Sequence, residues 1–535
     1  MSRASHHFSQ APQANVPRSV FNRSHAYKTT FDAGYLIPIF CDEILPGDTF
    51  NLKMTGFSRL ATPFYPIMDN LFMETFFFFV PNRLIWDNWK KFNGERKNPN
   101  DQIDYVVPVL KPAPDGLQSG SIYDYFGLPV AEADATPLPK NLKDIIALPF
   151  RAYNLIYNEW FRDQNMIDSI PVPTGDGPDD LDTNYLLRRR GKRYDYFTSC
   201  LPWPQKGPSV CLPLGDQAQI KAKSKDKIYM DTDGDNTDRI LAYNSKGSGA
   251  TEQNFYLRNY NVTGNFDVHF KDPVPLYADL TTATATCINS LRQAFQIQKL
   301  YERDARGGTR YTEIIQSHFG VVSPDARQQR PEYLGGGSSP VIVNPIAQTS
   351  AVEGQPSPLG NLAAYGTCAL HDHGFTKSFT EHGYVIGLVS VRADLTYQKG
   401  IERYWSRKTR FDFYWPVLSH LGEQAVLNKE IYAQGTDDDE KVFGYQERYA
   451  EYRYKPALIT GKFRSVVKSS LDPWHLSQDF KSLPTLSKDF IEENPPMSRI
   501  EAVPTQPDFI FDSWFSLRCA RPMPTYSVPG LVDHF

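Results

Sequence analysis

Alternating apolar and polar residues predict β-strands near the N-terminus. Phe50, Leu52 and Met54 alternate with polar neighbours, and the aromatic run from Leu71 to Val80 ends at Pro81. A period of two is typical of a half-buried strand, whereas a continuous apolar run is typical of a strand buried on both faces.

The same alternation returns in the C-terminal part of the chain. Every second residue from Val389 to Tyr397 is apolar, and Phe511, Phe515 and Leu517 share one parity. Strands at both ends, with few between them, predict one sheet system whose connections are greatly enlarged. A two-sheet sandwich accepts long insertions because loop-closure entropy rises only slowly with length.

Helical spacing of apolar residues predicts helices within these insertions. The residues that share a helix face are Ile288, Leu291 and Phe295, then Tyr311, Ile314, Ile315, His318 and Phe319, then Leu418, Leu421 and Ala425. Gly320 and Gly435 are suitable C-terminal stops for the second and third helices. We interpret all three as packing elements, with His318 a core or boundary histidine rather than a ligand.

Residues 1–31 contain no acidic residue and are predicted to form a basic N-terminal arm. Its cations are Arg3, Arg18, Arg23 and Lys28. Such a segment cannot bury enough apolar surface to fold alone, so it should lie along a neighbouring subunit or a polyanion. The alternative is a frayed terminus.

Residues 215–265 are polar, charged and rich in glycine, which predicts an exposed insertion. Alternation at Phe266, Val268 and Phe270 then predicts a return to a sheet. The predicted organisation is therefore an arm (1–31), sandwich strands with inserted loops and helices (32–214), the exposed insertion (215–265), and the remaining strands with helical insertions and an extended C-terminal segment (266–535).

Composition excludes several classes of protein. Hydrophobic residues are 41 % of the chain and the net charge is -4, so the chain should bury a large core and is not a histone-like nucleic-acid binder. Its apolar runs are too short to insert into a membrane. The first ten residues lack the apolar core of a secretion signal, so folding in a cytoplasm is expected. The six cysteines include no CxxC pair, which argues against a disulfide framework or a zinc site.

Candidate metal and catalytic motifs fail on inspection. Asp231, Asp233 and Asp235 resemble the start of an EF-hand loop, but Asn236 and Ala242 stand where glycine and a bidentate glutamate are needed. His371 and His373 lack further ligands at a recognised spacing. Phosphate-cradling loops, GxSxG and HExxH are absent from the sequence. We therefore expect no enzyme, no metal and no cofactor.

The densest basic cluster is followed at once by aromatic residues. It comprises Arg188, Arg189, Arg190, Lys192 and Arg193, with Tyr194, Tyr196 and Phe197 behind it. Cations that meet phosphates and rings that stack on bases suit single-stranded nucleic acid. The alternative is a solvated loop paired with the preceding acidic run of Asp176, Asp179, Asp180 and Asp182.

Five segments carry a family resemblance. They are KTTFDAGYLIPIFCDEILPGDTF (28–50), FTSCLPWPQKGPSVCLPLG (197–215), RYTEIIQSHFGVVSPDARQQRPEYLGGGS (310–338), VFGYQERYAEYRYKP (442–456) and CARPMPTYSVPGLVDHF (519–535). Together they closely resemble the major capsid protein of gokushoviruses, small single-stranded DNA bacteriophages of the microvirus family. The resemblance implies a mainly β protein with a single eight-stranded jelly roll, an antiparallel β-sandwich with long, partly helical loop insertions.

The same resemblance implies a structural role in a T=1 icosahedral virion capsid, assembled in the cytoplasm of a bacterial host around a circular single-stranded DNA genome. Expected partners are further copies of the chain, the genome, a small basic DNA-binding protein, pilot or scaffolding proteins, and a host surface receptor.

Insertion 215–265 is the candidate three-fold protrusion. Its candidate host contacts are Asp231, Asp233, Asp235, Asn236, Asn244 and Lys246. Candidate DNA contacts are the arm cations and the Arg188–Arg193 cluster. The alternatives are a carbohydrate-binding or carbohydrate-active β-sandwich, suggested by the 13 % aromatic content, and a non-capsid virion component such as a spike.

Overall fold

The computed structural model describes residues 17–61, 63–102, 104–113, 115–131, 142–210, 288–322, 329–349 and 360–526, and six short strands between residues 219 and 279. The chain forms two compact units. The first contains residues 1–204 and 303–535, and the second contains Gln205–Glu302.

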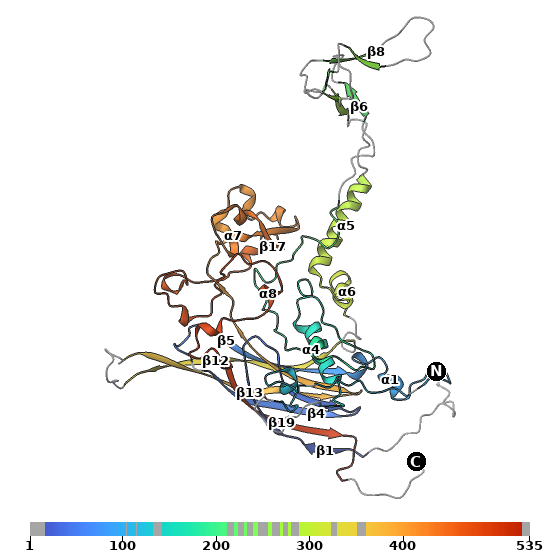
Figure 1. The fold of residues 1–535 in the computed structure, drawn as a ribbon, viewed down its shortest axis with the longest axis vertical. Coiled ribbons are helices and arrows are strands. Elements are labelled where there is room, and N and C mark those ends of the chain that lie inside the picture. Colours follow the sequence, from blue (N-terminus) through green and yellow to red (C-terminus); the bar gives the residue numbers. More distant parts are fainter. Residues whose placement is uncertain are drawn as a thin grey trace. The chain divides into compact units, whose positions relative to one another are not determined.

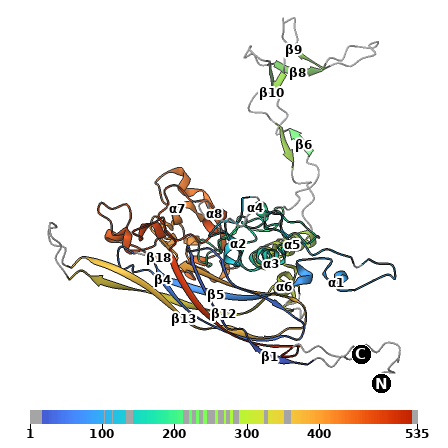
Figure 2. The same ribbon diagram turned by 60° about the horizontal axis from the view of Figure 1, so that its bottom comes forward.

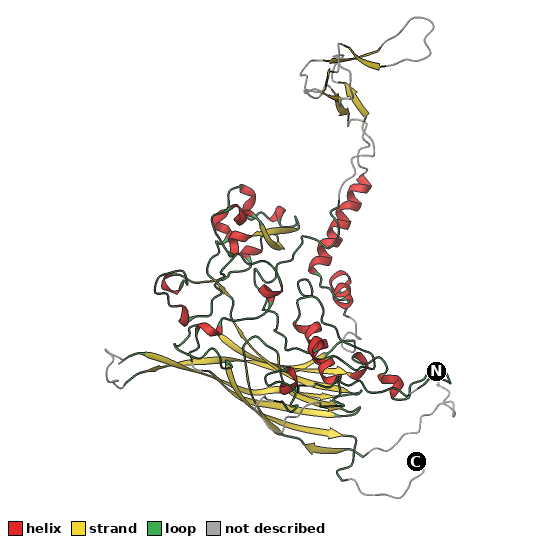
Figure 3. Ribbon diagram, viewed as in Figure 1, coloured by secondary structure: helices red, strands yellow, loops and turns green. Residues whose placement is uncertain are grey.

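The first unit is built on one antiparallel sheet system of nine strands (Figures 1 and 3). The strands are β1 (Ser19–Asn22), β2 (His25–Phe31), β3 (Ile37–Ile44), β4 (Thr49–Leu60), β5 (Leu71–Pro81), β12 (Glu332–Ala347), β13 (Leu362–Ser378), β14 (Gly383–Ala393) and β19 (Phe509–Arg521). Because β1 and β2 pair with successive stretches of β19, they share one position, and the nine strands fill eight positions.

The strand order is that of a jelly roll. One half has the order β1/β2, β19, β4, β13, and the other has the order β12, β5, β14, β3. Numbered along the chain, the positions are 1-8-3-6 and 5-4-7-2, so each sheet combines strands from both ends of the sequence. Strand β12 joins the halves, since it pairs with β5 up to Val341 and with β13 from Ile342. The expected mainly β, eight-stranded jelly roll is confirmed.

The N-terminal segment differs from the predicted arm. Residues from Ser19 to Phe31 form β1 and β2, which pair with this chain's own β19. Phe31 is buried in the sandwich, and this anchors the segment. The arm cation Arg3 lies outside the described residues.

The sandwich core is made by alternate residues of the facing sheets. In β4 every second residue is buried, among them Phe50, Leu52 and Met54, and β19 repeats the pattern from Phe509 to Cys519. Burial of each large apolar side chain is worth about 1.5–3 kcal/mol. The strands predicted at these positions are confirmed.

Strands β5 and β14 are buried on both faces. Phe77 and Phe79 of β5 face the sandwich core, whereas Phe78 and Val80 face a second core under helix α3 (Leu148–Ile156). The prediction of a half-buried strand over 389–397 is wrong, because β14 ends at Ala393 and is buried at both parities. The insertion between β5 and β12 covers its outer face (Figure 2).

Two long insertions carry the remaining elements of the first unit. Between β5 and β12 lie α1 (Trp89–Phe92), α2 (Ile122–Tyr125), α3, α4 (Leu181–Asn184), α5 (Ile288–Arg306), which crosses the boundary between the units, and α6 (Tyr311–Phe319). Between β14 and β19 lie β15 (Thr396–Tyr397), β16 (Glu423–Leu427), α7 (Asn428–Ile431), β17 (Val442–Glu447), β18 (Ala457–Leu458) and α8 (Lys488–Ile491).

Two of the three predicted helices are confirmed. Helix α5 covers 288–306, and α6 ends at Gly320, whose φ of 70° is left-handed. No residue of α6 is buried, so its apolar stripe is not the packing face that we expected. The helix predicted from Leu418 is wrong: the segment forms β16, which pairs with β17 and buries Gln424 and Val426 at alternate positions.

The second unit contains two small sheets. The strands are β6 (Gln219–Ala222), β7 (Tyr229–Thr232), β8 (Arg239–Tyr243), β9 (Phe255–Arg258), β10 (Val268–Phe270) and β11 (Leu276–Asp279). One sheet has the order β10-β7-β8-β9, and β11 pairs with β6. The strand expected near 266–270 is therefore β10, which pairs with β7 inside this unit rather than with the jelly roll.

A buried ion cluster fastens the first insertion to the sandwich. The Glu74 carboxylate of β5 accepts hydrogen bonds from Arg190 Nη1 (2.5 Å), Arg193 Nη2 (2.7 Å) and Arg392 Nε (2.9 Å). Burial alone would raise the pKa of Glu74, but the charges of Arg190 and Arg392 outweigh burial and lower the pKa to about 2. The ionised carboxylate is thus the stable form in the folded protein.

We predict that Glu74→Gln lowers the free energy of unfolding by about 3–5 kcal/mol, because it leaves the buried Arg190 guanidinium without a paired carboxylate, whereas Arg392 keeps its pair with Asp394. Urea denaturation of the unassembled protein measures this. A carboxylate whose folded pKa is depressed stabilises the fold above its unfolded pKa, so the difference should shrink as the pH falls from about 4.5 to about 2.

The matched control is Asp512→Asn, which removes an ion pair with Lys28 whose side chains are both more than half exposed. It should cost less than about 1 kcal/mol. Equal costs for the two variants would contradict a special role for the Glu74 cluster.

Candidate nucleic-acid interface

The sheet half formed by β2, β19, β4 and β13 has an uncovered outer face, which we call the open face. Its outward side chains alternate with core residues along each strand. The cations and rings that define it are Lys28, Lys53, Phe57, Arg59, Trp514 and Arg518. On the other half of the sheet system, the insertion between β5 and β12 covers the outer face of β5 and β14.

Strand register brings these side chains together. Phe57 lies opposite Asp512, and Trp514 lies opposite Thr55 on the neighbouring strand. Trp514 is 52 % exposed and Phe57 is 45 % exposed, which is high for such large rings in sheet strands. The rings therefore present their surfaces to solvent in the middle of the sheet.

Cations surround the rings. The guanidinium of Arg59 lies 5.9 Å from the Phe57 ring centroid. Lys28 pairs with Asp512 at 2.5 Å and Lys53 with Asp372 at 3.3 Å, all with largely exposed side chains. Exposed pairs of this kind are worth little, so a phosphate can replace either carboxylate. Exposed rings that stack on bases, next to cations that meet phosphates, suit single-stranded nucleic acid.

Of the described arm cations, Arg18 lies beside this face, whereas Arg23 binds β3 of the other half. Arg18 Nη2 donates a hydrogen bond to Thr49 Oγ1 at 2.9 Å, and Arg23 forms an ion pair with Asp42. Lys28 belongs to the open face itself. Residues Lys53, Arg59, Arg518, Phe57 and Trp514 were missed by the sequence analysis, although their shared parity in two predicted strands was the available signal.

Basic side chains of the Arg188–Arg193 cluster bind partners within the same chain. Arg190 and Lys192 are only 8 % and 9 % exposed. Arg190 binds Glu74, Lys192 Nζ donates to the Phe490 carbonyl at 2.6 Å, and the Arg189 guanidinium lies 4.1 Å from the Tyr35 ring centroid.

The remaining two members of the cluster are Arg188, which is partly buried, and Arg193, which is exposed. The backbone N–H of Arg188 donates to the Tyr153 hydroxyl, and Arg193 keeps an exposed side chain while binding Glu74. Of the rings behind the cluster, Tyr196 and Phe197 are buried and Tyr194 is exposed.

Three of the four carboxylates in the preceding acidic run have partners outside this cluster, and the side chain of the fourth, Asp182, lies outside the described residues. Asp179 pairs with Arg151 in the second core, Asp176 accepts from Trp86 and Asn88, and Asp180 pairs with Lys111. Sequence proximity therefore misidentified the counter-charges.

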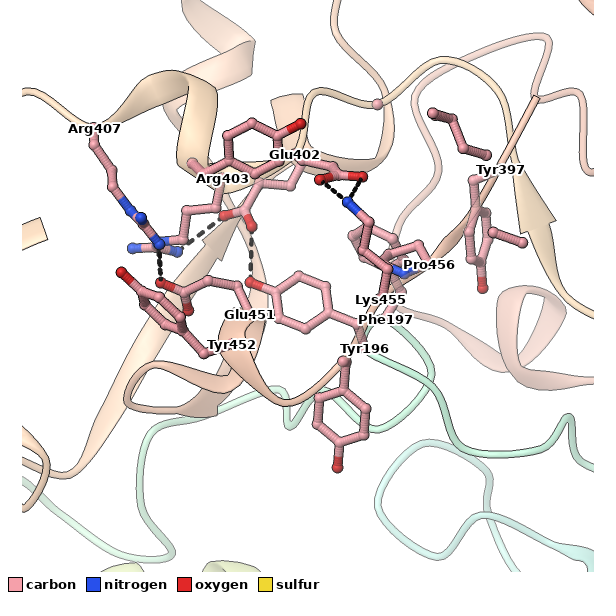
Figure 4. Close-up of a pocket in the computed structure, with 16 residues that line it drawn as sticks. Tyr196, Phe197, Tyr397, Glu402, Arg403, Arg407, Glu451, Tyr452, Lys455 and Pro456 are labelled. Atoms are coloured by element: carbon pink, nitrogen blue, oxygen red, sulfur yellow. Dashed lines mark hydrogen bonds and ion pairs between the residues drawn. The ribbon is translucent and has the colours of Figure 1, made fainter. Parts of the chain in front are cut away.

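A pocket of about 440 Å³ lies between the insertion that joins β14 to β19 and residues Tyr196 and Phe197 of the first insertion (Figure 4). Tyrosine rings line it, and its charged groups bind one another. Arg403 pairs with Glu430 at 2.9 Å, Tyr196 donates to Glu430 at 2.8 Å, and Lys455 binds Glu402 at 2.6 Å. Burial raises the pKa of Glu430, although Arg403 opposes the shift. These partnerships occupy the groups that general acid–base chemistry would need.

Of the two histidines noted in the sequence, His373 has a structural role. His373 is buried, with Nδ1 2.8 Å from Thr75 Oγ1 and Nε2 3.2 Å from Ser339 Oγ. Burial, and then His371, lower the pKa of His373. Among the described residues, no group of three acidic, histidine or cysteine side chains could hold a metal ion.

The glycine run before Ser338 also serves packing. A Cβ atom on Gly336 would lie 2.0 Å from the Thr75 carbonyl oxygen, so only glycine lets β12 approach β5 this closely.

The candidate host contacts fall largely outside the described part of the chain. Asp231 lies in β7 and pairs in register with His269 of β10. The remaining candidates, Asp233, Asp235, Asn236, Asn244 and Lys246, lie outside the described residues.

Comparison with known proteins decides the family. The family model described as capsid protein (F protein) matches residues 9–531. The chain is 48 % identical to capsid protein VP1 of Bdellovibrio phage phiMH2K, over 99 % of this chain and 98 % of that relative. It is 46 % identical to capsid protein VP1 of Chlamydia phage 1 (98 % and 97 % covered) and 36 % identical to that of Spiroplasma virus 4 (98 % and 97 % covered).

The chain belongs to this phage capsid protein family. It is a structural capsid protein of a virion and not an enzyme, and it assembles with copies of itself into a shell. In the part of the capsid protein that the structure describes, none of the helices has the length and apolar character to cross a membrane.

Glu501 and Asp508 form a pair of buried carboxyl groups whose surroundings favour the protonated form. Burial first, and then the neighbouring Asp508 carboxylate, raise the pKa of Glu501. Glu501 is buried, and its Oε1 has no hydrogen-bond partner among the described residues. Asp508 accepts from the Ala33 N–H at 2.8 Å, so the pair lies where β2 ends and β19 begins.

We predict that Glu501→Gln stabilises the capsid protein at pH 8 by about 1–3 kcal/mol, the usual cost of one poorly satisfied buried polar group. A carboxyl group with a raised folded pKa stabilises the fold below its unfolded pKa and loses that contribution as the pH rises. Melting temperatures should therefore fall between pH 5 and 9 more steeply for wild type than for the variant. Exposed Glu95→Gln is the control, and parallel curves for wild type and Glu501→Gln would refute the assignment.

Proposed function

We propose that this capsid protein encloses a circular single-stranded DNA genome in a T=1 icosahedral shell, with the open face turned toward the DNA. The observation that carries the proposal is the joint exposure of Trp514 and Phe57 among Lys53, Arg59 and Arg518 on an uncovered sheet. Each exposed ring offers sequence-tolerant stacking worth about 1–3 kcal/mol per base.

Charge supports a local rather than a global contact. The net charge of -4 cannot neutralise a genome, whereas the open face carries Lys28, Lys53, Arg59 and Arg518, and segment 1–31 contains no acidic residue. Solution counterions and a small basic DNA-binding protein would supply the remaining charge. Arg3, Arg18, Arg23 and Lys28 remain proposed DNA contacts.

The opposite side of the first unit is the weaker candidate. The insertion that carries β16 and β17 also exposes rings and cations, but it lies across the sandwich from β19 and β1 (Figures 1 and 2). A closed shell turns only one of these sides inward. The open face includes β2, which belongs to the acid-free N-terminal segment, and this favours the open face as the inner side.

The remaining roles rest on the gokushovirus relatives. We propose assembly in a bacterial host cytoplasm with pilot or scaffolding proteins, and contact of the insertion 215–265 with a host surface receptor. The polar composition of this insertion suits exposure, and its candidate contacts are those given above.

We predict that the triple variant Lys53→Gln, Arg59→Gln, Arg518→Gln forms shells but lowers the DNA-filled fraction by about threefold or more. These side chains point away from the core, so the fold should be retained. Unassembled protein should bind a mixed-sequence single-stranded oligonucleotide with a salt dependence whose log–log slope is smaller by about 2, because three phosphate contacts are lost at roughly 0.7 each.

The matched control is Lys408→Gln, Lys462→Gln, Lys468→Gln, which removes three exposed cations from the insertion between β14 and β19. Density-gradient separation of filled and empty particles, with the oligonucleotide titration, compares the two triple variants. If the control loses packaging and the open-face variant does not, the orientation proposed here is reversed.

A further inference from the structure

Strands β12 and β13 continue beyond the jelly roll as a two-stranded ribbon. Strand β12 leaves its partner β5 after Val341, and β13 meets β4 only from Gly366 onward. Between these points, residues 342–347 of β12 pair with residues 362–367 of β13. We call this segment the ribbon, and it projects from one end of the sandwich in both views (Figures 1 and 2).

One face of the ribbon is apolar and exposed. Tyr365 lies opposite Asn344, and Ile342 and Ile346 lie two residues to either side of Asn344, so all share that face. Ile342 is 58 % exposed, and Ile346 and Tyr365 are each 48 % exposed. The described residues of this copy therefore leave the face uncovered.

The ribbon also lacks charge. From Ser339 to Leu370 the sequence contains one charged residue, Glu353, in a chain in which 22 % of residues are charged. Proteins usually protect free strand edges with lysine or other charges, which prevent edge-to-edge association. An isolated two-stranded hairpin is at best marginally stable in water. The ribbon thus has an adhesive surface and little intrinsic stability.

We propose that the ribbon docks on a neighbouring copy of this capsid protein and forms part of the contact that closes the shell. The proposal rests on the shell-forming role of the family. The ribbon carries no lysine or arginine, so it has nothing to offer DNA phosphates, whereas an uncharged apolar surface with a tyrosine suits the core of a protein interface. A ribbon about 20 Å long contributes a substantial part of a standard interface.

If the ribbon of one copy meets a different surface of the next, the contact is heterologous. Contacts of this kind generate closed rings when the rotation between copies closes. The open backbone edges of residues 342–347 and 362–365 add hydrogen-bonding capacity that a neighbouring strand or loop can satisfy.

The test is the double variant Ile346→Lys, Tyr365→Lys. Its melting temperature as a monomer should equal that of wild type, because neither side chain belongs to a core. The yield of closed shells, measured by sedimentation velocity and electron microscopy, should fall by about tenfold or more, since a lysine in a desolvated interface core is poorly tolerated.

Two controls make the result specific. Ile346→Val, Tyr365→Phe keeps the apolar surface and should assemble like wild type. Val106→Lys changes a residue that is 71 % exposed but lies outside the ribbon, and it should have a smaller effect. Normal shell yield from the double lysine variant would overturn the proposal.

A photo-crosslinking amino acid at position 365 identifies the occupant. In shells assembled without DNA, we expect a product with the mass of two chains. Crosslinks confined to DNA in filled particles, or to the same chain, would overturn the proposal. Because shell yield is measured without DNA, failure here is distinguishable from failure of the packaging experiment.

Discussion

Burial of β5 and β14 on both faces is the constraint on which the rest of the architecture depends. Phe78 and Val80 of β5 and Ile386 and Leu388 of β14 point away from the sandwich, and water would meet them if nothing lay above. At about 25 cal/mol per Å² of apolar surface, this cover is a major contribution to stability. The first insertion therefore has to fold back over this sheet, with α3 as its centre.

The sheet half that contains β4 and β19 is buried on one face only. In β4 and β19 only one parity is buried, so the outward residues need no cover and can be charged or aromatic without loss of stability. This asymmetry distinguishes the two sides of the protein before any copy of it meets another. One side carries insertions of more than a hundred residues, and the other presents a bare sheet to whatever lies beneath it.

The Glu74 cluster shows why cation density misleads when read along the sequence. Arg190 and Glu74 are 116 residues apart, and Arg392 joins from a further strand. The counter-charge that decides the role of an arginine is set by tertiary packing, which local composition does not report. The cations that resembled a phosphate site instead fasten the insertion to the sandwich.

Periodicity predicted the elements whose packing follows a simple pattern. Strands β4 and β19 and helices α5 and α6 were readable because their hydrophobic spacing matches one period, and β5 was readable from its continuous apolar run. The assignment to a jelly roll came from the family resemblance, since alternation gives strands but not their order. Strand β14 was misjudged because Ser390 and Arg392 are polar yet buried under the insertion, and β16 because three apolar residues satisfied helical spacing by coincidence. Strands β1 and β2 were missed because their polar residues face outward at a sheet edge.

Part of the candidate interface could be predicted from the alternation of apolar and polar residues. The outward parity of β4 and β19 was visible in the sequence, but it identifies a site only once the outer cover of each sheet is known. The apolar residues of the ribbon, in contrast, are typical of a strand in a core. They are exposed because β4 and β5 end before the ribbon does, so neither strand pairs with its outer part. Cations lie on the open face and are absent from the ribbon, so the two surfaces differ in the chemistry they can bind. A shell protein of slightly negative charge can hold a polyanion and its own copies only if these two kinds of contact are kept apart on its surface.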